Sequence, residues 1–113
     1  MRKIKSQSIG QYTIASIVVL KSDRGNFLLL DRDNHPNKGK MSPVGGKISA
    51  DLPESIHESA VREVYEETGI SVTTKDLSIY GMFTDVNMDC GDNWMVFVFR
   101  CHRLIDEDEL AVR

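Results

Sequence analysis

Three glutamates lie close together in residues 55–68, a stretch that the sequence predicts to be a helix. Glu63, Glu66 and Glu67 are spaced i, i+3 and i+4, so their carboxylates share one side of that helix. Each like-charge pair at this spacing is unfavourable by roughly 0.2–0.5 kcal/mol, and the C-terminal half of a helix also disfavours negative charge. Arg62 is the nearby cation, in the weaker orientation toward Glu66. Because hard divalent cations bind carboxylate oxygens, the cluster indicates either a metal site or a solvated acidic face.

The boundaries of this helix are marked by side chains that complete its ends. Ser55 and Glu58 form a capping box, with Pro53 just upstream, and Gly69 provides the C-terminal stop. The apolar residues of the helix form a single core-facing stripe: Ile56, Ala60 and Val64. Before the helix, Gly45 and Gly46 allow the backbone to approach a neighbouring group closely.

The residues from Gly46 to Ile70 resemble the Nudix box. That family pattern reads Gly, five residues, Glu, seven residues, then Arg-Glu-aliphatic-x-Glu-Glu-x-Gly-aliphatic. Every specified position from the glutamate onward is matched here: Glu54, Arg62, Glu63, Val64, Glu66, Glu67, Gly69 and Ile70. Seven residues rather than five separate Gly46 from Glu54, so the loop before the helix is longer than in the pattern. Residues 38–46 resemble the approach to the box in bacterial MutT-like enzymes.

The resemblance implies hydrolysis of a nucleoside diphosphate linked to another moiety, by attack of water on phosphorus with Mg²⁺ or Mn²⁺. It assigns metal binding to Gly46, Glu63, Glu66 and Glu67. The same three glutamates are the implied catalytic residues. It gives an architectural role to Glu54 and Arg62, as an ion pair, and to Gly69.

The charges of the chain are divided unevenly along its length. Residues 1–48 hold nine Lys or Arg and three Asp, 9 − 3 = +6, whereas residues 49–113 hold five basic and fourteen acidic residues, 5 − 14 = −9. The net charge of −3 argues against a protein that coats nucleic acid. Arg32 and Lys47 are the candidates for binding the substrate phosphates, while Lys38 and Lys40 are more consistent with solvated loop positions.

The predicted fold is α/β in the α+β sense, within one domain over residues 1–113. Residues 12–20 and 27–32 read as two strands of a hairpin, and 77–86 and 94–102 as two later strands. The box helix should cover one face of a mixed sheet. The resemblance implies an α/β/α sandwich, whose C-terminal helix is not apparent in this sequence.

Residues 105–110 are acidic, and we expect no further full element after them. Asp106–Glu109 fit an exposed acidic tail better than a source of a further catalytic carboxylate. An uncovered sheet face is compatible with a chain shorter than the complete fold or with a homodimer.

Several other side chains have a packing and a functional interpretation. Trp94 and Phe83 could stack on a base, but core packing is favoured for both. His57 lies beside the apolar stripe and is interpreted as structural, whereas His102 has no evident partner. Cys101 is expected as a buried strand residue with a reduced thiol.

The sequence contains no apolar run long enough to cross a bilayer and no signal-peptide cleavage pattern, so we expect a cytoplasmic protein without a membrane partner. A small-molecule nucleotide is the expected ligand. Two alternatives to an enzyme are open: a Nudix-like module that binds a nucleotide without hydrolysing it, and a purely structural acidic-helix domain. The complete set of box glutamates argues against the binding module.

Overall fold

The computed structural model describes residues 12–31, 41–48, 51, 53–87 and 92–110. Along the chain these form β1 (Tyr12–Val19), β2 (Leu30–Asp31), β3 (Met41–Ser42), β4 (Val44–Lys47), α1 (Ile56–Thr68), a 3₁₀ turn (Thr74–Asp76), β5 (Leu77–Asn87), β6 (Asp92–Cys101) and α2 (Glu107–Leu110). Within the described residues, none of the helices is long and apolar enough to cross a membrane.

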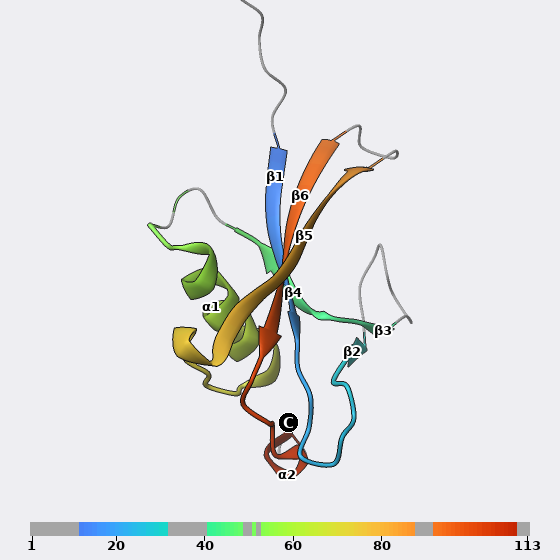
Figure 1. Ribbon diagram of the computed structural model, residues 1–113, viewed down its shortest axis with the longest axis vertical. Coiled ribbons are helices and arrows are strands. Elements are labelled where there is room, and N and C mark those ends of the chain that lie inside the picture. Colours follow the sequence, from blue (N-terminus) through green and yellow to red (C-terminus); the bar gives the residue numbers. More distant parts are fainter. Residues whose placement is uncertain (1–11, 32–40, 49–50, 52, 88–91, 111–113) are drawn as a thin grey trace, which may run out of the picture.

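Four of the strands form one mixed sheet in the order β4-β1-β6-β5. The central pair, β1 and β6, is parallel, and the two outer pairs are antiparallel. Figure 1 shows α1 against one side of this sheet. The predicted mixed sheet with one helix on a face is therefore confirmed. In the part of the chain that the structure describes, α1 is the only α-helix longer than one turn.

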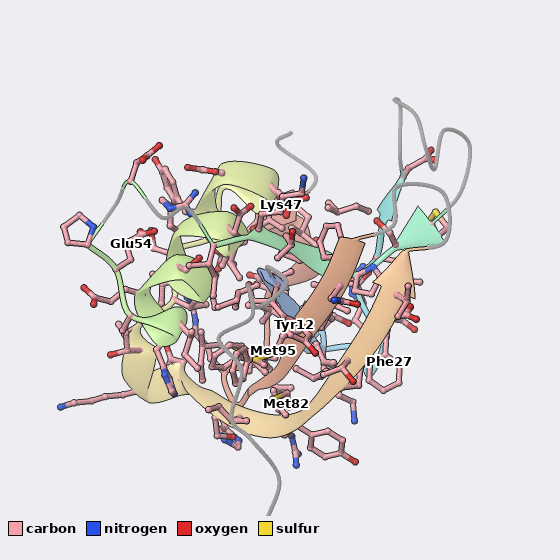
Figure 2. The ribbon with its side chains drawn as sticks, turned by 90° about the horizontal axis from the view of Figure 1, so that it is seen from above. Tyr12, Phe27, Lys47, Glu54, Met82 and Met95 are labelled. Carbon is pink, nitrogen blue, oxygen red and sulfur yellow. The ribbon has the colours of Figure 1, made fainter. Side chains whose placement is uncertain are left out.

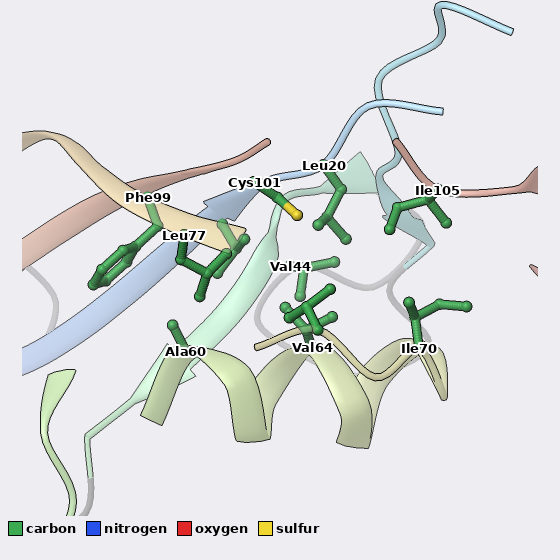
Figure 3. Close-up of a cluster of buried hydrophobic side chains, with 11 residues drawn as sticks. Leu20, Val44, Ala60, Val64, Ile70, Leu77, Phe99, Cys101 and Ile105 are labelled. Carbon is green, nitrogen blue, oxygen red and sulfur yellow. The ribbon is translucent and has the colours of Figure 1, made fainter. Parts of the chain in front are cut away.

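The core lies between α1 and the sheet (Figure 3). Ala60 and Val64 of the predicted apolar stripe are fully buried and belong to one cluster with Val18, Val44 and Phe99. Burying a side chain of the size of Val or Phe contributes roughly 1.5–3 kcal/mol, so this cluster fixes α1 against β1 and β4.

The predicted ends of α1 are confirmed in detail. The Ser55 hydroxyl accepts the Glu58 backbone N–H at 3.1 Å, and the Glu58 carboxylate accepts the Ser55 N–H at 3.0 Å. Gly69 has φ +77°, in the left-handed region that favours glycine, and its N–H donates to the Tyr65 carbonyl at 2.8 Å.

The predicted hairpin of residues 12–20 and 27–32 is wrong beyond its first contacts. Phe27 forms an isolated bridge with Lys21, and the Leu28 N–H donates to the Leu20 carbonyl at 3.0 Å. Past that point the chain leaves β1, and β2 pairs with β3 in a separate two-stranded sheet. The physical reason is that β4 and β6 already occupy both edges of β1.

The acidic residues interpreted as an exposed tail are in part structured. A single helical turn, α2, is held against the turn at residues 22–26. Ile105 is fully buried in the core, and the Ser22 hydroxyl donates to the Glu107 carboxylate at 2.8 Å. Arg24 pairs with Asp108 at 3.0 Å. The acidic residues are therefore partly structural, because they bind the turn at residues 22–26.

Two expectations about single side chains change, and two are confirmed. Phe83 does not pack in the core but is 45% exposed, and His102 has a partner, because its Nε2 lies 2.7 Å from the Ser78 hydroxyl. Cys101 is a buried free thiol, and burial raises its pKa. His57 packs edge-on against the Phe99 ring at 4.9 Å, as a structural residue would.

Candidate metal centre

The two glycines of β4 bring the backbone against the glutamates of α1. A Cβ atom at Gly46 would lie only 2.7–2.8 Å from the carboxylate atoms of Glu63. At Gly45, φ is +154° and a Cβ would overlap the Ser16 carbonyl oxygen, while the Gly45 N–H donates to Glu67 Oε1 at 2.9 Å. The close approach predicted for Gly45 and Gly46 is therefore present, and it exists because neither residue has a side chain.

Arg62 joins the carboxylates on both sides of it along the chain. Its Nε donates to the two carboxylate oxygens of Glu54 at 3.1 and 2.9 Å, which is the ion pair implied by the resemblance. Its Nη1 donates to Glu63 Oε1 and to both oxygens of Glu66, each at 3.2 Å. Hydrogen bonding to Glu54 is the main cause that raises the pKa of the guanidinium, so Arg62 remains a cation.

The electrostatic environment of Glu63 disfavours its negative charge. Its side chain is 13% exposed, compared with 53% for that of Glu66. Burial is the main cause that raises the pKa of Glu63; Arg62 lowers it, and the charges of Glu66 and Glu67 raise it. The carboxylates thus carry more negative charge than Arg62 neutralises. Binding of an added cation would reduce the repulsion between them.

Within the described ranges, no three His, Cys, Asp or Glu side chains are arranged as a group ready to hold a metal ion. The hydrogen bonds explain this, because Arg62 holds Glu63 and Glu66 while the Gly45 amide holds Glu67. The donors themselves fit a hard divalent cation, since carboxylate oxygens are the ligands that Mg²⁺ and Mn²⁺ prefer. The site therefore has the right chemistry, and its glutamates must turn from these internal partners to bind a metal.

The predicted phosphate-binding residues are not brought to the glutamates by the described structure. Side chains alternate along β4, so Lys47 points to the opposite face from Gly46. Its Nζ lies 5.4 Å from the centre of the Trp94 ring, a cation–π contact. Figure 2 shows Lys47 on β4 and Glu54 beside the start of α1. Arg32, Lys38 and Lys40 lie outside the described residues.

Sequence reasoning missed the contact between Lys47 and Trp94. These residues are far apart in the chain and are joined only through the register of β4, β1 and β6, in which Lys47 lies opposite Ala15 and Trp94 opposite Thr13. The Trp94 Nε1 is buried and has no hydrogen-bond partner among the described residues. No sequence signal of strand register was available that could have found this pair.

Comparison with known proteins identifies the family. The model of the NUDIX domain matches residues 11–112, so the chain belongs to the Nudix family. A protein named "Uncharacterized Nudix hydrolase YvcI" from Bacillus subtilis (strain 168) is 38% identical over 85 residues, which cover 72% of this chain and 48% of that protein. The chain thus spans about half the length of this curated relative.

Two solved structures show the same fold at low sequence identity. A MutT/nudix family protein from Enterococcus faecalis has a TM-score of 0.73 and 19% identity, over 87% of this chain and 39% of that one. The NUDIX domain of Shewanella oneidensis NrtR, in complex with ADP ribose, has a TM-score of 0.70 and 20% identity, over 87% of this chain and 63% of that one.

Proposed function

We propose that this protein is a Nudix hydrolase that uses Mg²⁺ or Mn²⁺ to hydrolyse a nucleoside diphosphate linked to another moiety, such as a nucleoside triphosphate or a related pyrophosphate. One observation carries the proposal: α1 presents Glu63, Glu66 and Glu67 beside the Gly45-Gly46 strand, with an excess of negative charge. The family and the ADP ribose bound by the similar NrtR domain support the class of ligand.

The protein's own residues would divide the work as follows. When bound, the metal would neutralise the diphosphate and lower the pKa of a bound water. Glu63, Glu66 and Glu67, with the Gly46 carbonyl, would hold it, and one of the three carboxylates would accept the proton of the attacking water. Arg62 would keep Glu54 and the preceding loop against α1, through its Nε, while its Nη1 releases Glu63 and Glu66.

The substrate phosphates would be bound by basic residues of the first half of the chain. Lys47 remains part of the proposal from its place at the start of the box, although its ammonium group lies over Trp94, on the face of β4 opposite Gly46. Arg32 remains part of the proposal from its place in the sequence. A small nucleotide rather than nucleic acid is the proposed partner, and the buried free thiol of Cys101 supports a reducing, cytoplasmic setting.

A second candidate is a module that binds a nucleotide without hydrolysing it. The observation that favours it is that all three glutamates already have partners inside the protein, Arg62 or the Gly45 amide. In such a module these contacts would persist when a nucleotide binds, and added Mg²⁺ or Mn²⁺ would not stabilise the protein.

The test is turnover of a panel of nucleoside triphosphates, sugar nucleotides and dinucleoside polyphosphates, with and without Mg²⁺, followed by chromatography of the products. We expect metal-dependent hydrolysis of at least one compound, and Glu66→Gln should lower turnover by roughly 10²–10⁴-fold with little change in thermal stability. Glu58→Gln is the matched control, since Glu58 lies on the same helix outside the cluster and Gln also completes a capping box.

Two results would separate the candidates. Tight binding of a nucleotide without turnover of any panel member would favour the binding module. An active Glu66→Gln protein would instead show that Glu66 has no catalytic role. Binding of Mn²⁺, measured by electron paramagnetic resonance, reports on the metal site independently of activity and should weaken in Glu66→Gln but not in Glu58→Gln.

A further inference from the structure

Two serine hydroxyls in the interior between α1 and the sheet have no hydrogen-bond partner among the described residues. Ser59 of α1 is fully buried, and Ser16 of β1 is 1% exposed. Buried polar groups in folded proteins nearly always have a partner, because an unsatisfied one lowers stability. Two unpaired hydroxyls on facing elements therefore indicate a group that they bind in another state of the protein.

Ser59 lies one helical turn before Glu63 on α1. Residues at i and i+4 of a helix are neighbours on its surface, with their Cβ atoms about 5–6 Å apart. Figure 3 shows Ala60, the residue after Ser59, pointing from α1 toward the sheet, and Ser59 itself is buried on this side of the helix. Its hydroxyl is therefore within reach of the Glu63 carboxylate through a change of side-chain rotamer.

Ser16 approaches the same carboxylate from the sheet. It lies opposite Gly46 in the antiparallel pairing of β1 and β4, and the Cβ positions of directly opposite residues are about 4.5–5.5 Å apart on one face. A Cβ at Gly46 would lie only 2.7–2.8 Å from the Glu63 carboxylate atoms, so this carboxylate fills the space beside Ser16 that a side chain at position 46 would take. Hydroxyls from α1 and from β1 thus flank Glu63.

Glu63 must give up its present hydrogen bond in order to bind a metal. In the part of the chain that the structure describes, Arg62 Nη1 is the donor to this carboxylate, at 3.2 Å from Oε1. Only 13% of the Glu63 side chain is exposed, so water has little access to the carboxylate after Arg62 releases it. A buried carboxylate that binds a metal through one oxygen needs hydrogen bonds from the protein to keep its orientation. Ser16 and Ser59 are buried donors available at this place.

We propose that Ser16 and Ser59 are positioning residues for Glu63: once Arg62 releases the carboxylate, both hydroxyls donate to it and hold it in its metal-binding orientation. The serines act through Glu63 and touch neither the metal nor the substrate. Their hydroxyls gain partners only in the metal-bound state, so they favour that state over the metal-free one. This inference rests on the proposed metal-dependent function and adds the residues that prepare one of its ligands.

Binding of Mn²⁺ to Ser16→Ala and Ser59→Ala, measured by electron paramagnetic resonance, tests the inference. Each variant should bind Mn²⁺ about 10–100-fold more weakly than the wild type, the usual effect of removing a partner of a metal ligand. Without metal, each should melt at the wild-type temperature or above it, because the hydroxyl that is removed has no partner in that state. The rise in melting temperature on addition of Mn²⁺ should be smaller in both variants.

Ser22→Ala is the matched control, since Ser22 is also 1% exposed but its hydroxyl donates to Glu107 at 2.8 Å. It should lower the melting temperature and leave the affinity for Mn²⁺ unchanged.

Three results would overturn the role of the two serines. If the wild type binds Mn²⁺ and both alanine variants bind it equally tightly, the positioning role fails while the proposed function stands. If both variants melt as far below the wild type as Ser22→Ala does without metal, the hydroxyls are structural. A wild type that binds no Mn²⁺ overturns the proposed metal-dependent function, and the role of the serines with it.

Discussion

The two α-helices, α1 and α2, are stabilised by contacts of very different range along the chain. The capping contacts of α1 and its ion pair with the preceding residue join positions three to eight apart, as in Ser55 with Glu58 and Glu54 with Arg62. The contacts that join α2 to the rest of the fold include pairs more than eighty positions apart, as in Ser22 with Glu107. The Asp106 carboxylate caps the four-residue α2 locally by accepting the Asp108 N–H at 2.9 Å, and the 22–26 turn binds the same helix through Ser22 and Arg24.

This difference separates two kinds of structural information. A helix with local caps can be recognised from neighbouring residues, and its boundaries follow from the chemistry of its ends. A single turn bound to a distant loop is harder to recognise, even with a local cap such as Asp106, because an isolated helix of that length is unstable in water. The glutamates are carried by the first kind of helix, which explains why their arrangement could be anticipated.

The largest effect on stability is expected at Ile105, next to the helix α2 that is bound to a distant part of the chain. Ile105→Ala should lower the free energy of unfolding by about 4 kcal/mol, within the usual range for truncating a fully buried Ile, because Ile105 anchors α2 to the core. Urea denaturation followed by circular dichroism measures it. Ile79→Ala is the control, since Ile79 is half exposed, and it should cost much less. Equal losses in the two variants would show that Ile105 is not the anchor.

A smaller but still large effect is expected where β4, whose Gly45 amide binds Glu67 of α1, packs against β1. Gly45→Ala should cost about 3 kcal/mol, because the new Cβ would overlap the Ser16 carbonyl and the backbone has a positive φ. Gly25 also has a positive φ, +82°, but no atom lies near its Cβ position, so Gly25→Ala should cost only about 1 kcal/mol of backbone strain. Comparing the melting temperatures of the two variants separates the cost of the steric overlap at Gly45 from the cost of backbone strain. Similar melting temperatures would contradict a steric cost at Gly45.

The smallest effect is expected from the local contacts of α1. Ser55→Ala should cost about 1 kcal/mol, because it leaves the Glu58 backbone N–H without its acceptor. The capping box also depends on pH: hydrogen bonding to the Ser55 backbone lowers the pKa of Glu58. Its contribution is therefore present above the ordinary carboxyl pKa and lost as the pH falls through the lowered value. Urea titrations at neutral and acidic pH should show that the wild type loses the contribution of Glu58 to the free energy of unfolding at acidic pH. In Glu58→Gln the contribution of this residue should be the same at both pH values.

The parts of the fold that sequence could predict are those in which neighbouring residues agree. The helix, its caps, the Gly45-Gly46 approach and the later strands were all indicated by spacing and residue type. The strand predicted at 27–32 failed for a different reason. Its apolar residues are compatible with pairing to β1, but β4 pairs with that edge of β1 instead. Which of two distant segments pairs with a strand cannot be predicted from the sequence of either segment alone.

The candidate site shows the same division. The shared face of Glu63, Glu66 and Glu67 follows from helical periodicity alone. The engagement of Glu67 by the Gly45 amide, and the turning of Lys47 toward Trp94, depend on how β4 is placed against α1 and β1. Arg32, the other predicted phosphate ligand, lies outside the described residues and stays a prediction.

The sequence by itself determined the family pattern, the capped helix and the cluster of carboxylates, because each depends on interactions within a few residues. Only the tertiary structure decided that the Gly45 amide holds Glu67, that Lys47 lies on the opposite face of β4, and that the acidic residues after Leu104 form a turn bound to Ser22. These contacts are set by sheet order and register. Both arise from the packing of segments that are distant in the chain.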